Sequence, residues 1–211
     1  TQNQAFSALV FLYRYVVGRD IEEMGSFKRA RRPKRVPVVL SRGEVARVLR
    51  VINGQTGLVA RLLYGSGLRI SEAVALRVKD LDFDYGILHV TSGKGAKDRQ
   101  TMMPEGLRTP LRRQLAKART VHEADLKEGN GRAPLPFAFD RKSRNAATKM
   151  RWQFLFPAST MSVDRETGKI LRFHLSPSTV QKEVRRAAVA AGIRKRVTCH
   201  TFRHSFATHL L

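Results

Sequence analysis

A short, highly basic segment that contains a proline limits how this chain can fold. Residues 28–35 read Lys-Arg-Ala-Arg-Arg-Pro-Lys-Arg, with six positive charges in eight positions. Proline lacks the backbone N–H that a helix interior needs, and like charges at this density repel one another. We therefore expect neither a helix nor a core strand here, and we interpret residues 28–40 as a basic linker between two folded parts.

The charge of the whole chain indicates what this linker contacts. The 211 residues contain 40 Lys and Arg against 17 Asp and Glu, which gives a formal net charge of +23. This excess favours a polyanionic partner, so we expect the linker to contact a phosphate backbone. The alternative is a solvated charge run without a partner. The candidate contacts are Arg31, Arg32, Lys34 and Arg35.

Composition also bounds the class of protein. Hydrophobic residues make up 42% of the sequence, enough to bury a core, so a disordered basic tail is not expected. No apolar run approaches the roughly 18 residues of a membrane span, and no signal peptide opens the sequence. We expect a soluble protein of the cytoplasm. The single cysteine, Cys199, has no disulfide partner within the chain and no CxxC partner for a zinc knuckle.

Helical signals stand on both sides of the linker. Apolar residues before it recur with helical spacing, and without an initiator methionine or a cap we interpret residues 1–27 as the end of a longer helical unit. Beyond it, Ser41 and Glu44 have the spacing of a capping box, which predicts that a second unit begins there. The apolar stripe behind this box is Val45, Val48, Leu49 and Ile52.

The second unit is predicted to be mainly helical with one small antiparallel sheet, an α+β fold. Helices are expected over 58–64, 71–76 and 104–118, and residues 86–103 alternate as strand, glycine-rich turn and strand. Residues 120–150 are polar with weak structural signals, so we interpret them as an insertion.

The core is expected to resume after this insertion. Residues 152–157 form an apolar, strand-like run, and residues 165–169 form a turn. Ser176 and Pro177 supply an N-cap and a first-turn proline for a helix that Gly192 closes.

The final helix places cationic and histidine side chains along one face. His200, Arg203 and His204 are spaced to project together and bind an anion. Two histidines four residues apart would also suit zinc, but no Glu lies between them as in HExxH and no third ligand is evident. We therefore expect no metal and no cofactor.

Three separated segments resemble the motifs of tyrosine recombinases, in order and in spacing. They are Gly67-Leu-Arg-Ile-Ser-Glu72, Gly93-Lys-Gly-Ala-Lys-Asp-Arg99 and His200-Thr-Phe-Arg-His-Ser-Phe-Ala-Thr-His209. The resemblance implies a catalytic domain over residues 41–211, incomplete at its C-terminal end. It also implies that residues 1–27 are the end of a helical, SAM-like core-binding domain.

The insertion resembles the extra segment of integron integrases. We place this segment at about residues 120–175, and it includes Trp152 and His174. Two short stretches depart from the usual integron pattern, namely residues 141–144 and 173–175, so the details of site recognition stay open. The resemblance implies that Trp152 and His174 stack on unpaired bases of folded, single-stranded recombination sites. Core packing of Trp152 and a satisfied loop role for His174 are the alternatives.

The resemblance also implies how the motif residues act on DNA. A tyrosine would attack a phosphodiester to form a 3′-phosphotyrosyl intermediate, with Arg69 and Arg203 stabilising the transition state as fixed cations. Lys94 would protonate the departing 5′ oxygen, with Lys97 as the fallback or as a phosphate contact. His200 would hydrogen-bond the scissile phosphate or assist proton movement.

Glu72 would orient an arginine, and an exposed helix charge is its alternative reading. The four tyrosines all precede the final motif, and none matches the nucleophile's place. We therefore expect this chain alone to lack strand cleavage, although its parent cleaves and rejoins DNA, as a homotetramer on its site. A non-catalytic, DNA-binding remnant and a basic RNA-binding protein are the alternative functions.

Overall fold

The computed structural model describes most of the chain. The described residues are 2–18, 36–91, 98–136, 139, 143, 145–165 and 167–211. They divide into two compact units, Thr1–Val36 and Pro37–Leu211. The candidate linker contacts Arg31, Arg32, Lys34 and Arg35 lie outside the described residues.

Residues 2–17, which the structure describes in the first unit, are helical. They form α1 (Gln2–Leu12), which continues into a π-helical turn, η1 (Tyr13–Val17). Gly18 ends it in the left-handed conformation, with φ at 71°, which suits a residue without a side chain. The prediction of a helix over these residues is confirmed. No side chain among the described residues of α1 is buried.

The second unit is built mainly from helices, and α2 and α7 begin at the predicted caps. Ser41 and Glu44 form the capping box: the Glu44 N–H donates to Ser41 Oγ at 3.2 Å and the Ser41 N–H donates to Glu44 Oε2 at 2.7 Å. Ser176 accepts from the Ser178 N–H, and Pro177 occupies the first turn. The helices of this unit are α2 (Arg42–Val51), α3 (Gly54–Gly65), α4 (Ile70–Val74), α5 (Arg108–Lys127), α7 (Pro177–Ala190) and α8 (Cys199–Leu210).

One small antiparallel sheet packs among these helices. Its order is β1 (Leu81–Asp82), β2 (Ile87–Val90) and β3 (Arg99–Met102). The β2–β3 hairpin was predicted, and its register pairs Leu88 with Thr101 and Val90 with Arg99. Leu88 and Val90 are buried, so one face of the sheet joins the core. The short β1 strand was not predicted, because two residues carry no detectable alternation.

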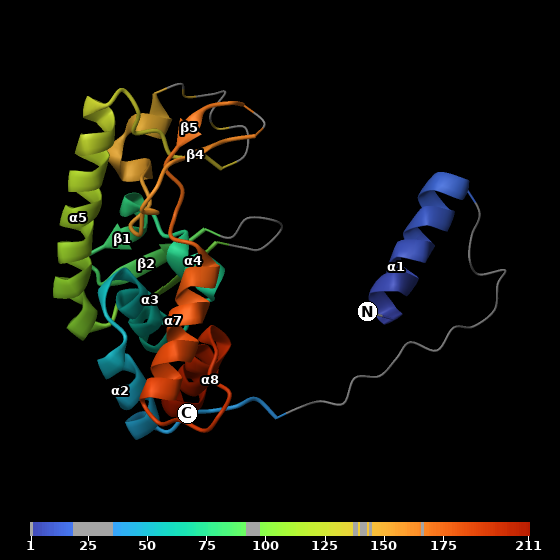
Figure 1. Cartoon of the computed structure of the whole chain (residues 1–211), viewed down its shortest axis with the longest axis vertical. Helices are drawn as coiled ribbons and strands as arrows, with labels where there is room; N and C mark the ends of the chain where they lie inside the picture. The colour runs from blue at the N-terminus through green and yellow to red at the C-terminus, as the bar shows by residue number, and fades with distance from the viewer. Residues whose placement is uncertain are drawn as a thin grey trace. The chain divides into compact units, whose positions relative to one another are not determined.

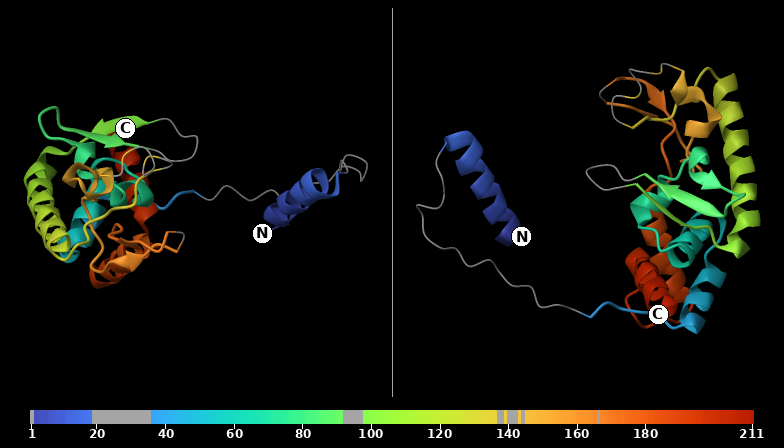
Figure 2. Two further views of the ribbon diagram at one scale, coloured as in Figure 1. Left: turned by 90° about the horizontal axis from the view of Figure 1, so that it is seen from above. Right: turned by 180° about the vertical axis from the view of Figure 1, so that it is seen from behind.

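The core gathers around α3, which buries six of its residues. Leu62 and Leu63 of α3, Phe202 of α8 and Phe156 are fully buried. Figures 1 and 2 show α2, α7 and α8 at one end of the second unit, the β4–β5 hairpin at the other, and α5 running lengthwise along the side. In the part of the chain that the structure describes, no helix is long and apolar enough to cross a membrane.

The region after residue 118 differs from the prediction. The expected helix 104–118 begins at Arg108, after a 3-10 turn, and extends to Lys127, because α5 continues to bury side chains such as His122 and Asp125. The expected strand at 152–157 is wrong: Met150–Trp152 form a 3-10 turn, and Phe154 and Pro157 make isolated β-bridges. The expected turn at 165–169 lies in the hairpin of β4 (Ser162–Val163) and β5 (Ile170–Leu171).

A nearly buried ion pair fastens this region to α5. Arg172 Nε donates to Asp125 Oδ2 at 2.8 Å, and its Nη2 donates to the other carboxylate oxygen. Its Nη1 also donates to the carbonyl oxygens of Ala158 and Ser159 at 3.0 and 3.1 Å. The side chains of Arg172 and Asp125 are 11% and 6% exposed, so the pair is well shielded from water.

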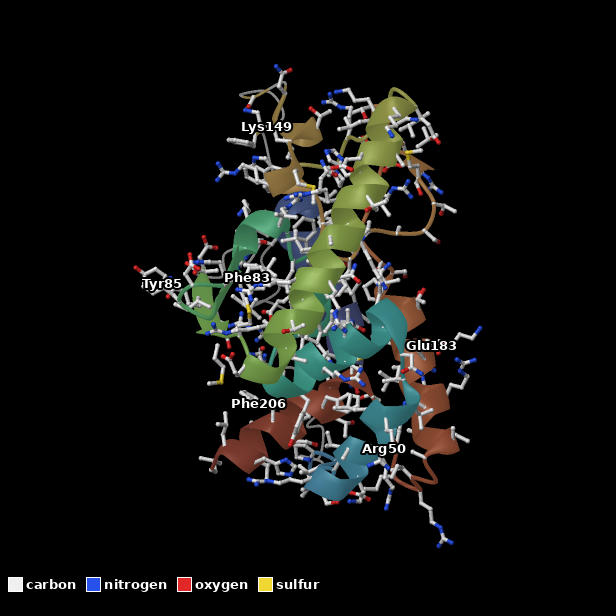
Figure 3. All side chains as sticks on the ribbon, turned by 90° about the vertical axis from the view of Figure 1, so that its left-hand side faces the viewer. Arg50, Phe83, Tyr85, Lys149, Glu183 and Phe206 are labelled. Carbon is white, nitrogen blue, oxygen red and sulfur yellow. The ribbon has the colours of Figure 1, made fainter. Side chains whose placement is uncertain are left out.

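Arg172→Met should lower the free energy of unfolding by about 3 kcal/mol, because it leaves the Asp125 carboxylate buried without its partner. Urea unfolding at neutral pH measures this loss. Arg186→Met is the matched control: Arg186 pairs with Glu183 on the exposed face of α7 (Figure 3), and its loss should cost less than about 0.5 kcal/mol. Equal losses in the two variants would contradict the role given to the Arg172 pair.

Candidate functional site

A tight turn between α3 and α4 brings the first motif against the last helix. Gly67 has a φ of +61°, and a Cβ added there would lie 2.6 Å from the Phe206 ring of α8. Only glycine meets both demands, the left-handed backbone and the close approach. Leu68 follows with no exposed surface and anchors the turn in the core. Arg69 is therefore delivered to the surface beside α8.

Arg203 of α8 is bound directly to this turn. Its Nη1 donates a hydrogen bond to the Gly67 carbonyl oxygen. Burial lowers the pKa of Arg203, and the neighbouring positive charges of Arg69 and Arg99 lower it further, against the opposing effect of Glu72. An arginine stays charged despite such a shift, so Arg203 and Arg69 form a region of concentrated positive charge.

Glu72 holds two of these arginines together. Its carboxylate accepts from the Arg69 N–H at 2.7 Å and from Arg69 Nη1 at 2.8 Å. It also accepts a two-pronged pair of bonds from Arg99, at 2.8 and 2.7 Å. Burial by itself would raise the pKa of Glu72, but the bonds from Arg99 and Arg69 dominate and lower it from 4.5 to about 2. Glu72 is thus a fixed anion that orients cations, and its side chain is only 9% exposed.

Arg99 was missed by the sequence reasoning as a site residue. It was noted only as the end of the hairpin motif, yet its bond to Glu72 raises its own pKa and fixes its guanidinium. It is the first residue of β3, 27 positions from Glu72 along the chain. A sequence signal was present, because an arginine at a strand end beside a motif lysine is a candidate anion contact. Its carboxylate partner required the fold.

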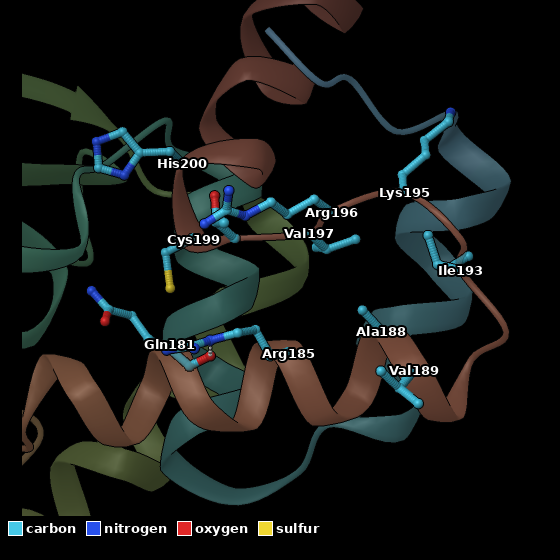
Figure 4. Close-up of a pocket in the computed structure, with 11 residues that line it drawn as sticks. Gln181, Arg185, Ala188, Val189, Ile193, Lys195, Arg196, Val197, Cys199 and His200 are labelled. Atoms are coloured by element: carbon cyan, nitrogen blue, oxygen red, sulfur yellow. Dashed lines mark hydrogen bonds between the residues drawn. The ribbon is translucent and has the colours of Figure 1, made fainter.

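His200 makes no described hydrogen bond or ion pair with this carboxylate-centred cluster. It lies in the first turn of α8, three residues before Arg203, and its side chain is exposed. It lines a cavity of about 540 Å³ between α7 and α8, together with Arg185 and Arg196 (Figure 4). Cys199 lines the same cavity, and burial raises the pKa of its thiol to about 11, so it stays protonated and unreactive at neutral pH.

A second cavity, of about 640 Å³, joins the motif residues to the insertion. Its wall includes Arg69 and Glu72 on one side and Trp152, Phe154 and His174 on the other. The two insertion residues singled out from the sequence therefore face the same space as the first motif arginine. That juxtaposition comes from the fold, because Arg69 and Trp152 are 83 residues apart.

Arg77 fixes the insertion side of this cavity. Burial lowers the pKa of its guanidinium, which donates to the carbonyl oxygens of Trp152 and of Pro134, the latter at 2.7 Å. The same group lies 4.3 Å from the centre of the Phe154 ring. A charged fork that satisfies two carbonyls and stacks on a ring holds the lining in one arrangement.

Trp152 and His174 retain both of their possible roles in this arrangement. The Trp152 ring is half-buried, 4.9 Å from the Phe139 ring and 5.0 Å from Lys79 Nζ. His174 Nδ1 lies 2.9 Å from the Leu175 carbonyl oxygen, and its ring meets Phe154 edge to face at 5.1 Å. Each is packed, yet each also lines the cavity.

Several predicted site residues lie outside the described residues. Lys94 and Lys97 at the hairpin tip are among them, as are the linker arginines and Lys34. Within the described part of the chain, no three histidine, cysteine or acidic side chains lie close enough to hold a metal ion.

The four tyrosines are all among the described residues. Tyr13 and Tyr15 belong to the first unit, and Tyr85 projects from the β1–β2 turn, 82% exposed (Figure 3). Tyr64 is engaged through its hydroxyl, which lies 2.9 Å from His209 Nδ1. No described contact joins the Tyr64 or Tyr85 hydroxyl to Arg69 or Arg203.

Comparisons with known proteins bear on this site. Residues 39–211 match the phage integrase family. An integrase/recombinase from Escherichia coli is 45% identical over 211 residues, which cover all of this chain and 63% of that protein. The tyrosine recombinase XerA of Pyrococcus furiosus is 32% identical over 193 residues, covering 90% of this chain and 54% of that protein. The chain thus spans less than two thirds of the length of these relatives.

Solved structures of recombinases are also similar to this chain. A crystal structure of XerA recombinase matches with a TM-score of 0.55 and 26% identity, over 99% of this chain and 61% of that one. The XerH recombinase bound to difH substrate matches with a TM-score of 0.57 at 22% identity, over 96% of this chain and 52% of that one, a likeness of fold.

The low pKa of Glu72 predicts acid sensitivity of the unit. Because its folded value of about 2 lies below its ordinary value of 4.5, its stabilising effect is complete above about pH 4.5 and is lost as the pH falls toward 2. Glu72→Gln should therefore be less stable at neutral pH and lose less stability across that window. Urea unfolding at a series of pH values measures both, with the exposed Glu123→Gln as the control. A wild-type pH profile in Glu72→Gln would contradict this assignment.

Proposed function

Because the chain belongs to the phage integrase family of tyrosine recombinases, we propose that it carries the cationic half of an active site that breaks and rejoins DNA. The observation that carries this proposal is the carboxylate of Glu72, which aligns Arg69 and Arg99 beside Arg203. The Glu72 carboxylate holds the guanidinium groups of Arg69 and Arg99 in position before a DNA phosphate binds. Preorganised cations stabilise a phosphoryl transition state without a metal.

Arg69 and Arg203 have distinct parts in this proposal. The Arg69 side chain is 55% exposed, and in the described structure one of its terminal nitrogens binds Glu72, which leaves the rest of its fork directed at solvent. Arg203 donates a hydrogen bond to the Gly67 carbonyl oxygen, which holds its guanidinium next to the turn that precedes Arg69. Two arginine forks held this way suit the nonbridging oxygens of one phosphodiester.

The proton transfers complete the mechanism. We assign protonation of the departing 5′ oxygen to Lys94, with Lys97 as a phosphate contact, on the strength of the family resemblance alone. His200, exposed at the start of α8, would hydrogen-bond the scissile phosphate. The attacking group would be a tyrosine. Since neither Tyr64 nor Tyr85 makes a described contact with the two arginines and no tyrosine matches the nucleophile's place in the motif order, we propose that these 211 residues alone do not cleave DNA.

A chimera tests the catalytic assignment. The 211 residues would replace the matched stretch of the 45% identical Escherichia coli integrase/recombinase, which supplies the remaining 37% of the length. Arg203→Ala in this chimera should lower the yield of covalent protein–DNA adduct by about 100-fold or more, because a transition-state contact is lost. DNA affinity should change less than about threefold, since other phosphate contacts carry binding.

The control is Arg186→Ala, which removes one exposed arginine of α7. It should leave the adduct yield unchanged. A normal yield in Arg203→Ala would refute the assignment of that residue, and the absence of any DNA binding by the unmodified 211-residue chain would refute the function.

We further propose that the cavity between the motif and the insertion accepts an unpaired base, which makes the protein an integron-type integrase that acts on folded single-stranded sites. Two aromatic rings and His174 line this cavity beside Arg69, and Arg77 and Lys79 add positive charge. Aromatic faces with adjacent cations suit a flipped base and its phosphate. Such a protein would work as a tetramer on bacterial DNA in the cytoplasm, in keeping with the family resemblance.

Trp152→Ala should lower the preference for a DNA hairpin with unpaired bases over a fully paired duplex by about tenfold, because one base–aromatic stack is lost. Fluorescence anisotropy with the two DNAs measures this ratio. Trp152→Phe should retain most of the preference, since it keeps an aromatic face. An equal loss of affinity for both DNAs in Trp152→Ala would indicate that Trp152 serves packing instead.

A further inference from the structure

The chain enters the second unit through a short segment that is bonded to the last helix. We call residues 39–44 the entry strap; they follow the basic segment 28–35 almost directly. The strap contacts α8 or the loop before it along most of its length, although α8 is more than 150 residues away in sequence. Each of these contacts is a hydrogen bond made by the side chain of Ser205, Lys195 or Arg42.

The central contact is fully buried. The Leu40 backbone N–H donates to Ser205 Oγ at 2.9 Å, and both residues have no exposed surface. The same hydroxyl donates to the Thr201 carbonyl oxygen at 2.8 Å, one turn earlier in α8. Ser205 thus joins the strap to the turn of α8 that carries Arg203. A buried N–H without such an acceptor would be costly, so the contact is persistent.

A second contact fixes the beginning of the strap. Lys195 lies in the loop before α8 (Figure 4). It donates to the Val39 carbonyl oxygen at 3.2 Å and to Glu44 Oε2 at 2.7 Å. Glu44 in turn accepts the Ser41 N–H as part of the capping box of α2. The hydrogen bond from Lys195 lowers the pKa of Glu44, so the pair is charged at neutral pH.

A third contact reaches the far end of α8. Arg42 Nη2 donates to the His209 carbonyl oxygen at 3.3 Å. The His209 ring lies edge to face with Tyr64 of α3, at 5.8 Å, and Tyr64 is bonded to its Nδ1. The strap therefore contacts the approach to α8, its middle and its end.

These contacts place α8 between two constraints. On one side Arg203 binds the Gly67 carbonyl, and Phe206 packs on Gly67. On the other side Ser205 binds the strap. A displacement of the strap would therefore change where His200 and Arg203 stand relative to the turn that carries Arg69, because α8 is a single rigid helix.

We propose that Ser205 is a positioning residue that couples the entry strap to the cations of α8. This inference rests on the proposed function, together with the expectation from the sequence that the basic segment 28–35 contacts DNA. DNA bound in front of the strap would restrain Leu40, and through Ser205 it would restrain the middle of α8. The catalytic cations would thereby be ordered when the protein sits on its substrate.

Hydrogen–deuterium exchange of the 211-residue chain, with and without labelled duplex DNA, tests the coupling. In the wild-type chain, DNA should slow exchange of the α8 amides over residues 203–207 by about fivefold, the equivalent of one buried hydrogen bond. Ser205→Thr keeps the hydroxyl and should keep this DNA-dependent slowing. Ser205→Ala should lose it, while DNA affinity, measured by anisotropy on the same samples, changes less than about twofold.

A second variant tests the same coupling in case Ser205→Ala does not fold. Lys195→Met acts at an exposed position and should halve the DNA-dependent slowing or reduce it further, whereas Lys182→Met, an equal loss of charge on α7, should not change it. Retention of the full slowing in both Ser205→Ala and Lys195→Met would overturn the proposal. A change in exchange that is identical with and without DNA would also overturn it, because that is the signature of a merely structural residue.

The failure of the proposed function has a different signature. In that case the wild-type chain shows no anisotropy change with DNA at all. If the wild-type chain binds DNA but its α8 amides show no DNA-dependent slowing, the coupling is refuted and the DNA-binding function is retained.

Discussion

The arrangement of this protein's site depends on one carboxylate surrounded by guanidinium groups. Arg69, Arg99 and Arg203 carry like charges that repel one another, in a chain whose net charge is +23. Glu72 offsets this repulsion. It accepts hydrogen bonds from Arg69 and Arg99, and its negative charge opposes the lowering of the pKa of Arg203. A carboxylate whose pKa is lowered to about 2 is an anion at neutral and at mildly acidic pH.

The parts of the fold that follow local rules were predictable. Ser41, Ser176 and Gly192 act through their own backbone neighbourhoods, so a short window of sequence is enough to recognise them. The motif arginines were recognisable because they recur with a known spacing. The class of fold and the family are confirmed, while the integron subtype and the individual roles of the site residues stay predictions.

Contacts between segments that are distant in sequence could not be predicted from a short window of sequence. The partner of Arg99 is a helix residue 27 positions away, and the carbonyls that Arg77 satisfies belong to a segment more than 50 positions away. The length of α5 was underestimated because its last two turns bury His122 and Asp125, polar residues that weaken an apolar pattern. Their burial becomes favourable only when Thr148 and Arg172 arrive as partners.

The geometry of α5 has a consequence for how proteins of this kind can diversify. Its 20 residues form a rod of about 30 Å whose first half packs on the core and whose second half carries the insertion. The insertion joins the apolar core around α3 through Leu155 and Phe156, whereas its β4–β5 hairpin is attached to α5 through discrete polar contacts, chiefly the Arg172 pair. A hairpin attached in this way can be lengthened, shortened or exchanged during evolution while the cations near the core keep their places, so the outer part of the insertion and the chemistry can change independently.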